Sequence, residues 1–378
     1  MPEIEFATDY GLILERIKHV DPLLYSRTRN FIGGAVSYLS PYISRGVISL
    51  KQVQQEALSK GYAPEKIEKF LQELAWREYY QRLWEVKKDD IWQDLKQVQP
   101  DVLHHDLVKA IVNANTGITT IDNQIKRLYD LGYMHNHTRM YVASIACNIA
   151  KTHWLKSSKW LYYHLLDGDI ASNNCSWQWV AGAFSSKKYY CNQENINRYT
   201  ETEQRNTFMD RPYEEINQMQ VPDELIERIN LPLKTVLPTT SLPIIDITRP
   251  TIIYNSYNMD PEWRKNENVN RILLLEPSHF YSYPVSEKVI NFIIALAKNI
   301  PDIQIYNGEI SAIKSLYNQS NLSLSEAFIS KEHVAFGHYP GIKDSYDWMF
   351  PEVVGEYSSF FSYWKRCSKF LQEYNLQA

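Results

Sequence analysis

The sequence predicts an α plus α/β protein, in which an all-helical domain is followed by a smaller, Rossmann-like α/β domain. From about residue 40 to residue 185, apolar residues recur at spacings of three and four, which is the period of an α-helix. Beyond residue 250, short β-branched runs alternate with helical stretches, which is typical of a parallel sheet. The 378 residues, 44% of them hydrophobic, are enough to build two cores.

Three segments of the first half carry helix signals. Residues 64–86 open with Pro64 at a first-turn position, and apolar side chains follow along one face. Residues 119–132 start with threonine and stop with glycine, and residues 137–155 predict one long, largely buried helix. We therefore expect an all-helical domain over residues 1–215.

Prolines recur between residues 219 and 250, where the helical periodicity of the first half ends. This run predicts a connector over residues 216–249. The runs TIIYNSY, RILLLEP and IQIYNG are expected to be strands, with a helix over residues 286–300 before the last of them. These elements predict a small α/β domain over residues 250–378.

Composition excludes several classes of protein. The net charge of −4 lacks the strong basic excess of a typical nucleic-acid binder, although a local basic groove is compatible with it. The four cysteines form no C-x-x-C motif and no pairing pattern, so neither a metal site nor a disulfide framework is expected. An acidic N-terminus and the lack of an apolar run of roughly 18 residues predict a cytoplasmic chain with no membrane segment.

The densest polar and aromatic stretch is DGDIASNNCSWQW, residues 167–179. An aspartate is rarely buried without a partner, so Asp167 and Asp169 need donors, and Arg139 in a neighbouring helix offers one. The alternative is a simple capping turn, in which Asp169 or Ser172 accepts hydrogen bonds from free backbone amides. Taken alone, this stretch favours the capping turn.

Three segments place polar and aromatic side chains together by helical spacing. They are Glu73, Trp76, Arg77 and Tyr80 in the first, Asn136, Arg139 and Met140 in the second, and Asn173 and Trp177 in the third. Such a set is a poor core, because every buried polar group needs a partner. It is typical of a pocket for a large, flat ligand with polar edges.

The segments FLQELAWREYY, GYMHNHTRMYVAS and LLDGDIASNNCSWQWVAG, in this order, resemble the flavin-binding helical domain of the DNA photolyase/cryptochrome family. Residues 25–49, YSRTRNFIGGAVSYLSPYISRGVIS, are similar to the phosphate-binding segment of that domain. The resemblance covers about residues 25–185 and is greatest to photolyases of cyclobutane pyrimidine dimers. The family's α/β antenna domain precedes the flavin module, so this chain resembles members without it. Residues 250–378 are expected to be either that domain relocated or an unrelated Rossmann-like domain.

The resemblance implies FAD as the cofactor and identifies no antenna chromophore. The implied cofactor-binding residues are Tyr25, Ser37, Leu39 and Ser40 for the pyrophosphate and ribityl part, Arg77 for the phosphates or the ring, and Asn136, Arg139, Asp167, Asp169 and Asn173. Arg139 would pair with Asp167, and Asp169 would accept a hydrogen bond from the ring edge. Asn173 would face flavin N5, where an asparagine is typical of photolyases and Asp or Cys of plant or animal cryptochromes.

The same resemblance implies damaged DNA as the partner. The implied substrate-binding residues are Glu73, Trp76, Asn136, His137, Met140 and Trp179. Aromatic faces stack on a flipped-out base, and Glu73 would donate a proton-bearing contact to it. The chain departs from the family at His137, where repair enzymes carry arginine, and at Cys175 and Ser176, which replace a glycine pair.

Trp177 and Trp154 match the inner two members of the family's tryptophan relay, so the implied catalytic set is Trp177, Trp154, Asn173 and Glu73. Ordinary core packing is the alternative for Trp154. The outer tryptophan is absent from its expected place near Asp101, and Tyr129 or Tyr133 is expected to substitute for it.

Two functions of different class remain open. The first is a deoxyribodipyrimidine photo-lyase-like enzyme, in which reduced FAD excited by blue light gives an electron to a cyclobutane dimer. The second is a cryptochrome-like photoreceptor that signals through a partner without repair. Glu73, Met140 and Asn173 favour the enzyme, whereas His137, the near-neutral charge and the missing front domain favour the photoreceptor. A non-catalytic helical scaffold is disfavoured by the arginine and carboxylate set.

Overall fold

The computed structural model describes residues 4–377, with side chains to Leu371, and the contacts within the chain divide it into two units. The helical unit contains residues 21–36 and 68–233, and the α/β unit contains residues 4–20, 37–67 and 234–377. The division is not linear along the sequence, because two N-terminal segments belong to the same unit as the C-terminal sheet. The combination of α and α/β structure expected from the sequence is confirmed.

The helical unit is built from nine described α-helices and short connecting elements. The α-helices are α2 (Pro22–Thr28), α5 (Glu68–Lys87), α6 (Lys109–Val112), α7 (Thr119–Leu131), α8 (Asn136–Ser144), α9 (Trp154–His164), α10 (Ile170–Ala181), α11 (Gln193–Thr200) and, as a single turn, α12 (Tyr213–Ile216). The 3-10 turns η2 (Lys88–Trp92) and η4 (Asp223–Leu225) and the antiparallel pair β1 (Leu107–Val108) and β2 (Arg228–Ile229) complete it.

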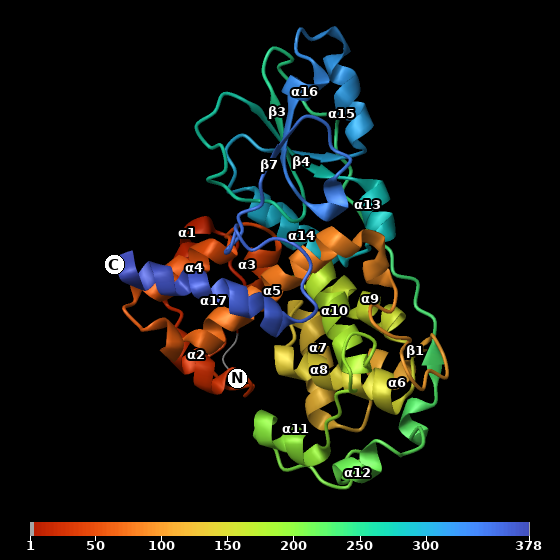
Figure 1. Ribbon diagram of the computed structural model, residues 1–378. Helices are drawn as coiled ribbons and strands as arrows, with labels where there is room; N and C mark the ends of the chain where they lie inside the picture. Colours follow the sequence, from red (N-terminus) through yellow and green to blue (C-terminus); the bar gives the residue numbers. More distant parts are fainter. Residues whose placement is uncertain (1–3, 378) are drawn as a thin grey trace. The chain divides into compact units, whose positions relative to one another are not determined.

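Helix α10 is central to this unit, because it packs against α5, α8 and α9 (Figure 1). Trp154, Trp160 and Trp177 lie in one hydrophobic core with apolar residues of α7 and α8. Helix α7 ends as the sequence predicts, at Gly132, whose φ of 70° is the left-handed conformation that glycine adopts without strain. The polar stretch at residues 167–179 is therefore held in the middle of the helical packing.

The predicted helix over residues 137–155 is wrong in its second half. Helix α8 continues as a π-helical turn, η3 (Ile145–Ile149), and then stops. Lys151 has a φ of 58°, and the Thr152 hydroxyl donates to the Asp106 carbonyl oxygen at 2.8 Å, so the backbone leaves the helix here. The His153 side chain then accepts a hydrogen bond from Leu155 N as the N-cap of α9. As a result Trp154 begins a new helix.

The α/β unit contains a five-stranded sheet with the order β5-β4-β3-β6-β7. The strands are β3 (Thr251–Tyr254), β4 (Asn270–Leu275), β5 (Gln304–Asn307), β6 (Phe328–Lys331) and β7 (Ile342–Asp344), and every pairing is parallel. When these five strands are renumbered 1 to 5 in chain order, the sheet order is 3-2-1-4-5, which is typical of a doubly wound fold. The predicted parallel sheet is confirmed, with two strands more than the three runs that suggested it.

Helices of the α/β unit come from both ends of the chain. They are α1 (Tyr10–Lys18), α3 (Ser40–Ser44), α4 (Leu50–Ser59), α13 (Pro277–Ser282), α14 (Glu287–Ala297), α15 (Ile310–Leu316), α16 (Leu324–Ala327) and α17 (Phe360–Gln377), with 3-10 turns η1 (Pro64–Lys66), η5 (Tyr317–Gln319) and η6 (Val334–Phe336). Helix α14 confirms the helix expected over residues 286–300.

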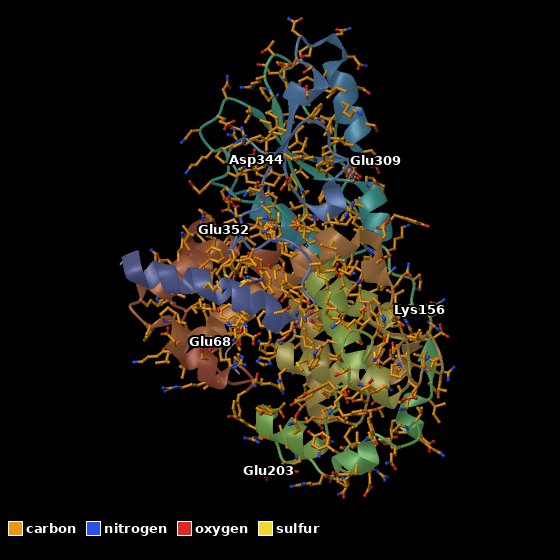
Figure 2. All side chains as sticks on the ribbon, viewed as in Figure 1. Glu68, Lys156, Glu203, Glu309, Asp344 and Glu352 are labelled. Carbon is orange, nitrogen blue, oxygen red and sulfur yellow. The ribbon has the colours of Figure 1, made fainter. Side chains whose placement is uncertain are left out.

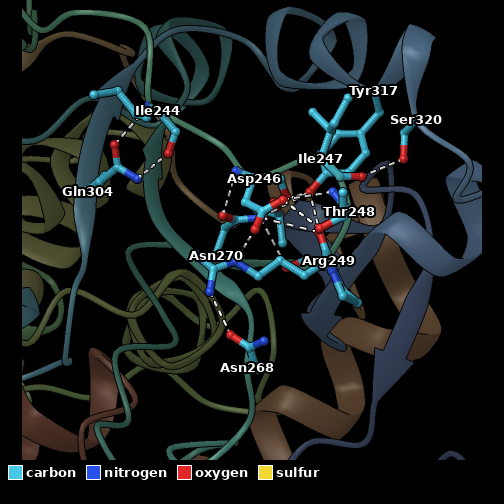
Figure 3. A network of polar contacts seen from close by, with 12 residues as sticks. Ile244, Asp246, Ile247, Thr248, Arg249, Asn268, Asn270, Gln304, Tyr317 and Ser320 are labelled. Carbon is cyan, nitrogen blue, oxygen red and sulfur yellow. Dashed lines mark hydrogen bonds and ion pairs between the residues drawn. The ribbon is translucent and has the colours of Figure 1, made fainter.

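Polar contacts attach the proline-rich segment to the sheet (Figure 3). The Asn270 side-chain amide donates to the Asp246 carbonyl oxygen at 3.0 Å, and Asn270 Oδ1 accepts from Asp246 N at 3.0 Å. Gln304 makes the same reciprocal pair with the backbone of Ile244, at 2.8 Å in each direction. The segment is thus ordered along the sheet although it contains no helix or strand between residues 230 and 250.

Candidate functional site

The turn before α10 satisfies both of its aspartates. Asp169 is the N-cap of α10, because its Oδ1 accepts from Ser172 N at 2.7 Å, and its Oδ2 accepts from the Gln81 amide of α5. Asp167, whose side chain is 2% exposed, lies two residues earlier and pairs with Arg139. Asp169 therefore makes the helix cap that its sequence context suggests, and its contact with a ring edge stays a prediction.

Arg139 projects from α8 toward the Asp167 carboxylate. Its Nη2 donates to Asp167 Oδ1 at 3.0 Å and to Oδ2 at 2.9 Å, which confirms the expected pair. Its Nε donates to the Met134 carbonyl oxygen at 2.8 Å, and its guanidinium lies 5.4 Å from the centre of the Tyr133 ring. The cation is thus fixed on three sides with 19% of its side chain exposed.

Asn173 lies one turn into α10. Its Nδ2 donates to the Ser158 carbonyl oxygen of α9 at 2.9 Å. This bond fixes the orientation of the amide, because a carbonyl oxygen can only accept. Asn173 Oδ1 makes no hydrogen bond within the part of the chain that the structure describes. An acceptor oxygen on a fixed amide is thus available to a ligand N–H.

Glu73 of α5 forms an ion pair with Arg29, at 3.1 Å between Arg29 Nε and Glu73 Oε1. The two side chains are 24% and 34% exposed. Burial raises the pKa of Glu73, and the nearby Arg29 guanidinium opposes that rise. Burial thus favours the neutral carboxyl group of Glu73, and the ion pair with Arg29 favours the ionised one.

His137 is packed among aromatic rings of the helical unit. Its ring centre lies 4.8 Å from that of Tyr141 and 4.6 Å from that of Tyr199. Burial, and secondarily the Arg29 charge, lowers the pKa of His137 to about 4, so the imidazole is neutral near pH 7. Its Nε2 is buried and makes no hydrogen bond to any described residue. The position at which repair enzymes of the family carry arginine is therefore uncharged here.

The tryptophans expected to stack on a base differ in exposure. Trp179 is 37% exposed, with its ring centre 5.8 Å from that of Tyr189. Trp76 is half-buried, 5.3 Å from the Tyr80 ring. The relay tryptophans are buried instead: Trp177 is 2% exposed and Trp154 is fully buried.

The other residues implied by the resemblance divide between the two units. Tyr25, Arg77, Asn136 and Met140 lie in the helical unit, where Asn136 is exposed and the Tyr25 ring packs edge-on against Phe70 at 5.1 Å. Ser37, Leu39 and Ser40 lie in the α/β unit, at the start of α3. Of the implied ring-side residues, the structure joins Arg139 and Asp167 directly, and the roles of the other ring-side and phosphate-side residues remain predictions.

Sequence reasoning missed the partners of these residues. Arg29 pairs with Glu73, Gln81 with Asp169, and the Ser158 carbonyl oxygen with Asn173. Arg29 falls four residues after Tyr25, so helical spacing could have drawn attention to it. The other two contacts join separate helices and leave no signal in the sequence.

These groups fit an isoalloxazine ring by their chemistry. Such a ring has a polar edge that donates and accepts hydrogen bonds, and an N5 that carries a proton when the ring is reduced. The open Oδ1 of Asn173 suits that proton, and the Arg139–Asp167 pair supplies a fixed dipole from the neighbouring helix. The residue types present in the helical unit therefore fit a flat cofactor with a polar edge.

Comparison with known proteins gives the particular family. Residues 70–236 match the family model described as the FAD binding domain of DNA photolyase. Over these residues the chain is similar to FAD-binding domains of the photolyase type.

Curated relatives match the same part of the chain. Deoxyribodipyrimidine photo-lyase of a Synechococcus species is 34% identical over 169 residues, which are 42% of this chain and 35% of the relative. The Streptomyces griseus protein of the same name is 31% identical over 156 residues, 40% of this chain and 33% of the relative. The matched part of this chain thus spans about a third of the length of these relatives.

Solved structures give partial matches. A bacterial class III photolyase from Agrobacterium tumefaciens is 30% identical, covers 46% of this chain and 38% of its own, and has a TM-score of 0.39. A cryptochrome of a Synechocystis species is 22% identical, with coverages of 53% and 46% and a TM-score of 0.46.

Two features are absent from the described residues. No cluster of His, Cys, Asp and Glu side chains there is arranged to hold a metal ion. No helix within residues 4–377 is long and apolar enough to span a membrane.

Proposed function

We propose that this chain binds FAD without a covalent link and uses blue light to split cyclobutane pyrimidine dimers in damaged DNA. When bound, reduced FAD supplies one-electron chemistry driven by light. The residues of the chain position the ring, keep water away and present hydrogen bonds to the damaged base. The observation that carries the proposal is the fixed amide of Asn173 in a domain of the photolyase family.

Asn173 supports a reduced cofactor for an electrostatic reason. Its neutral Oδ1 accepts an N–H without adding negative charge, whereas a carboxylate at the same place would repel an anionic ring. Its Nδ2 bond to the Ser158 carbonyl oxygen keeps the amide from turning over. The residue type and its orientation both favour a reduced, anionic ring.

Glu73 supports repair because burial raises the pKa of its carboxyl group. A protonated carboxyl donates a hydrogen bond to a carbonyl oxygen of a pyrimidine, and that bond strengthens as negative charge develops on the base. Arg29 holds the carboxyl group in place, with its Nε 3.1 Å from Glu73 Oε1. We assign Glu73 the donor role and Arg29 the positioning role.

The photoreceptor alternative is favoured by one observation. His137 is neutral and enclosed by Tyr141 and Tyr199, so it supplies no charge for a phosphate where repair enzymes carry arginine. A chain that keeps the flavin and loses this contact would bind damaged DNA weakly and signal by another route.

Repair of a dimer-containing oligonucleotide under blue light tests the proposal. With the flavin chemically reduced, the chain should restore thymine absorbance, and Glu73→Ala should lower the repair rate by about tenfold or more. Glu85→Ala is the matched control, because Glu85 lies on the same helix and also pairs with an arginine, Arg82, at 3.2 Å. The flavin spectrum should be unchanged in both variants.

No repair by a flavin-loaded wild-type chain would favour the photoreceptor. Equal repair by Glu73→Ala and by wild type would remove Glu73 from the mechanism while leaving the assignment of the family intact.

A further inference from the structure

The indole of Trp154 is hydrogen-bonded to a carboxylate. Trp154 is fully buried, and its Nε1 donates to Asp94 Oδ1 at 2.7 Å. Asp94 follows the turn η2 and reaches Trp154 at the start of α9. A buried tryptophan often finds a neutral acceptor, whereas this one donates to a potential base.

Asp94 is held by two further donors. Its Oδ2 accepts from Gln99 N at 2.8 Å, and His153 Nε2 lies 3.3 Å from its Oδ1. His153 Nδ1 accepts from Leu155 N, so the neutral imidazole carries its proton on Nε2 and donates it to Asp94. Burial lowers the pKa of His153, which favours this neutral form, while Asp94 opposes the shift.

The Asp94 carboxylate is also partly accessible to solvent. Its side chain is 17% exposed and that of His153 is 16% exposed, whereas Trp154 is not exposed at all. The exposed ring of His105 stacks on His153 with a centre distance of 4.7 Å. Asp94 is therefore placed between a buried indole and the solvent.

We propose that Asp94 accepts the indole proton of Trp154 when that residue is oxidised, and that this transfer makes Trp154 the last electron donor of the chain's relay. The inference rests on the proposed function and on the relay that the family resemblance implies, in which Trp177 would supply one electron to light-excited oxidised FAD. Trp154 then gives one electron to Trp177. Its N–H bond breaks with both electrons left on nitrogen, an O–H bond forms on Asp94, and a neutral indole radical remains.

The transfer explains how a relay can stop at Trp154. An indole that has lost an electron is far more acidic than a neutral indole, and once its proton is on Asp94 the electron's return must wait for that proton. Tyr129, an outer donor expected from the sequence, is engaged elsewhere: its hydroxyl donates to the Val112 carbonyl oxygen and accepts from Trp160 Nε1 at 3.2 Å. The acceptor at Trp154 takes the place of a further donor.

Light-induced infrared difference spectra of the flavin-loaded chain test the inference. The wild type should show the C=O band of a protonated carboxyl group together with the absorption of a neutral tryptophan radical, and Trp154→Phe should lose both. Asp94→Asn keeps the side-chain shape and should abolish the carboxyl band, leave a cationic radical and shorten its lifetime by about tenfold or more. Asp90→Asn, an exposed neighbour in η2, is the control and should behave as wild type.

A second measurement separates this inference from the flavin relay. In the flavin-free chain, a ruthenium polypyridyl photo-oxidant removes the electron instead, and the wild-type minus Trp154→Phe difference should again contain the carboxyl band. If this band appears and flavin photoreduction is unchanged in Trp177→Phe, the electron relay through Trp177 is excluded and Asp94 remains the proton acceptor of Trp154. A neutral Trp154 radical without the band, or a band that persists in Asp94→Asn, would overturn the inference.

Discussion

Replacing Asp167 by asparagine should destabilise the helical unit, because it leaves Arg139 without its anionic partner. Asp167 is 2% exposed and accepts two hydrogen bonds from Arg139 Nη2, at 2.9 and 3.0 Å. Breaking a buried pair by removing one partner costs about 3–5 kcal/mol. Arg139 keeps 19% exposure and its Met134 bond, so we expect the lower end, about 3 kcal/mol.

A surface pair provides the matched control. Lys156, labelled in Figure 2, pairs with Asp106 at 2.9 Å, and both side chains are 46% exposed. Asp106→Asn should therefore change the free energy of unfolding by less than about 1 kcal/mol.

Urea unfolding followed by tryptophan fluorescence is the assay. It reports mainly on the helical unit, which contains seven of the ten tryptophans: Trp76, Trp84, Trp92, Trp154, Trp160, Trp177 and Trp179. The midpoint should fall clearly for Asp167→Asn and barely for Asp106→Asn. Equal midpoints for the two variants would refute the reasoning that the Arg139–Asp167 pair is a buried, structurally required interaction.

Two other predictions concern the same unit. Burial lowers the pKa of His135 from 6.5 to about 4, so the unfolded chain binds more protons than the folded chain between these pH values. The contribution of the neutral His135 to the free energy of unfolding should therefore be complete above pH 6.5 and be lost as the pH falls toward 4. His135→Asn should flatten the pH dependence of the urea midpoint between pH 7 and pH 5, and an unchanged slope would show that His135 is not the titrating group. Gly132→Ala should cost about 2 kcal/mol or more, since φ is 70° and a Cβ would come within 2.6 Å of Leu166 Cγ. Gly117→Ala, with a φ of 79° and nothing within 4 Å, should cost only about 1 kcal/mol, and similar losses for both variants would exclude the clash with Leu166.

Local signals in the sequence predicted much of the fold. Gly132 marks the end of α7 by its own backbone preference, whereas Pro64 opens the 3-10 turn η1 and the helix predicted from residue 64 begins only at Glu68. The apolar runs at β3, β4 and β5 predict strands because buried parallel strands are hydrophobic throughout. The break between α8 and α9 was missed because Thr152 is pulled out of the helix by Asp106, a contact made across 46 residues. Strands β6 and β7 were missed because their sequences, FISK and IKD, contain shorter apolar runs than β3 and β4.

The candidate site likewise contains contacts that the sequence predicts and contacts that it does not. The Arg139–Asp167 pair was predicted because a buried aspartate requires a donor and an arginine was available on a neighbouring helix. The contacts of Asn173 with Ser158 and of Trp154 with Asp94 depend on how separate segments pack, so no spacing in the sequence predicts them. Residue types indicated the chemistry, and only packing gave the orientation of the groups that perform it.

The flavin content of the purified full chain tests the central claim most directly. The account predicts a yellow protein whose absorption spectrum is that of a bound flavin, and which releases FAD, identified by its mass, on denaturation without proteolysis. A chain isolated without flavin should take up FAD on incubation. A colourless chain that binds no added FAD, while showing the circular dichroism of a folded helical protein, would contradict the account.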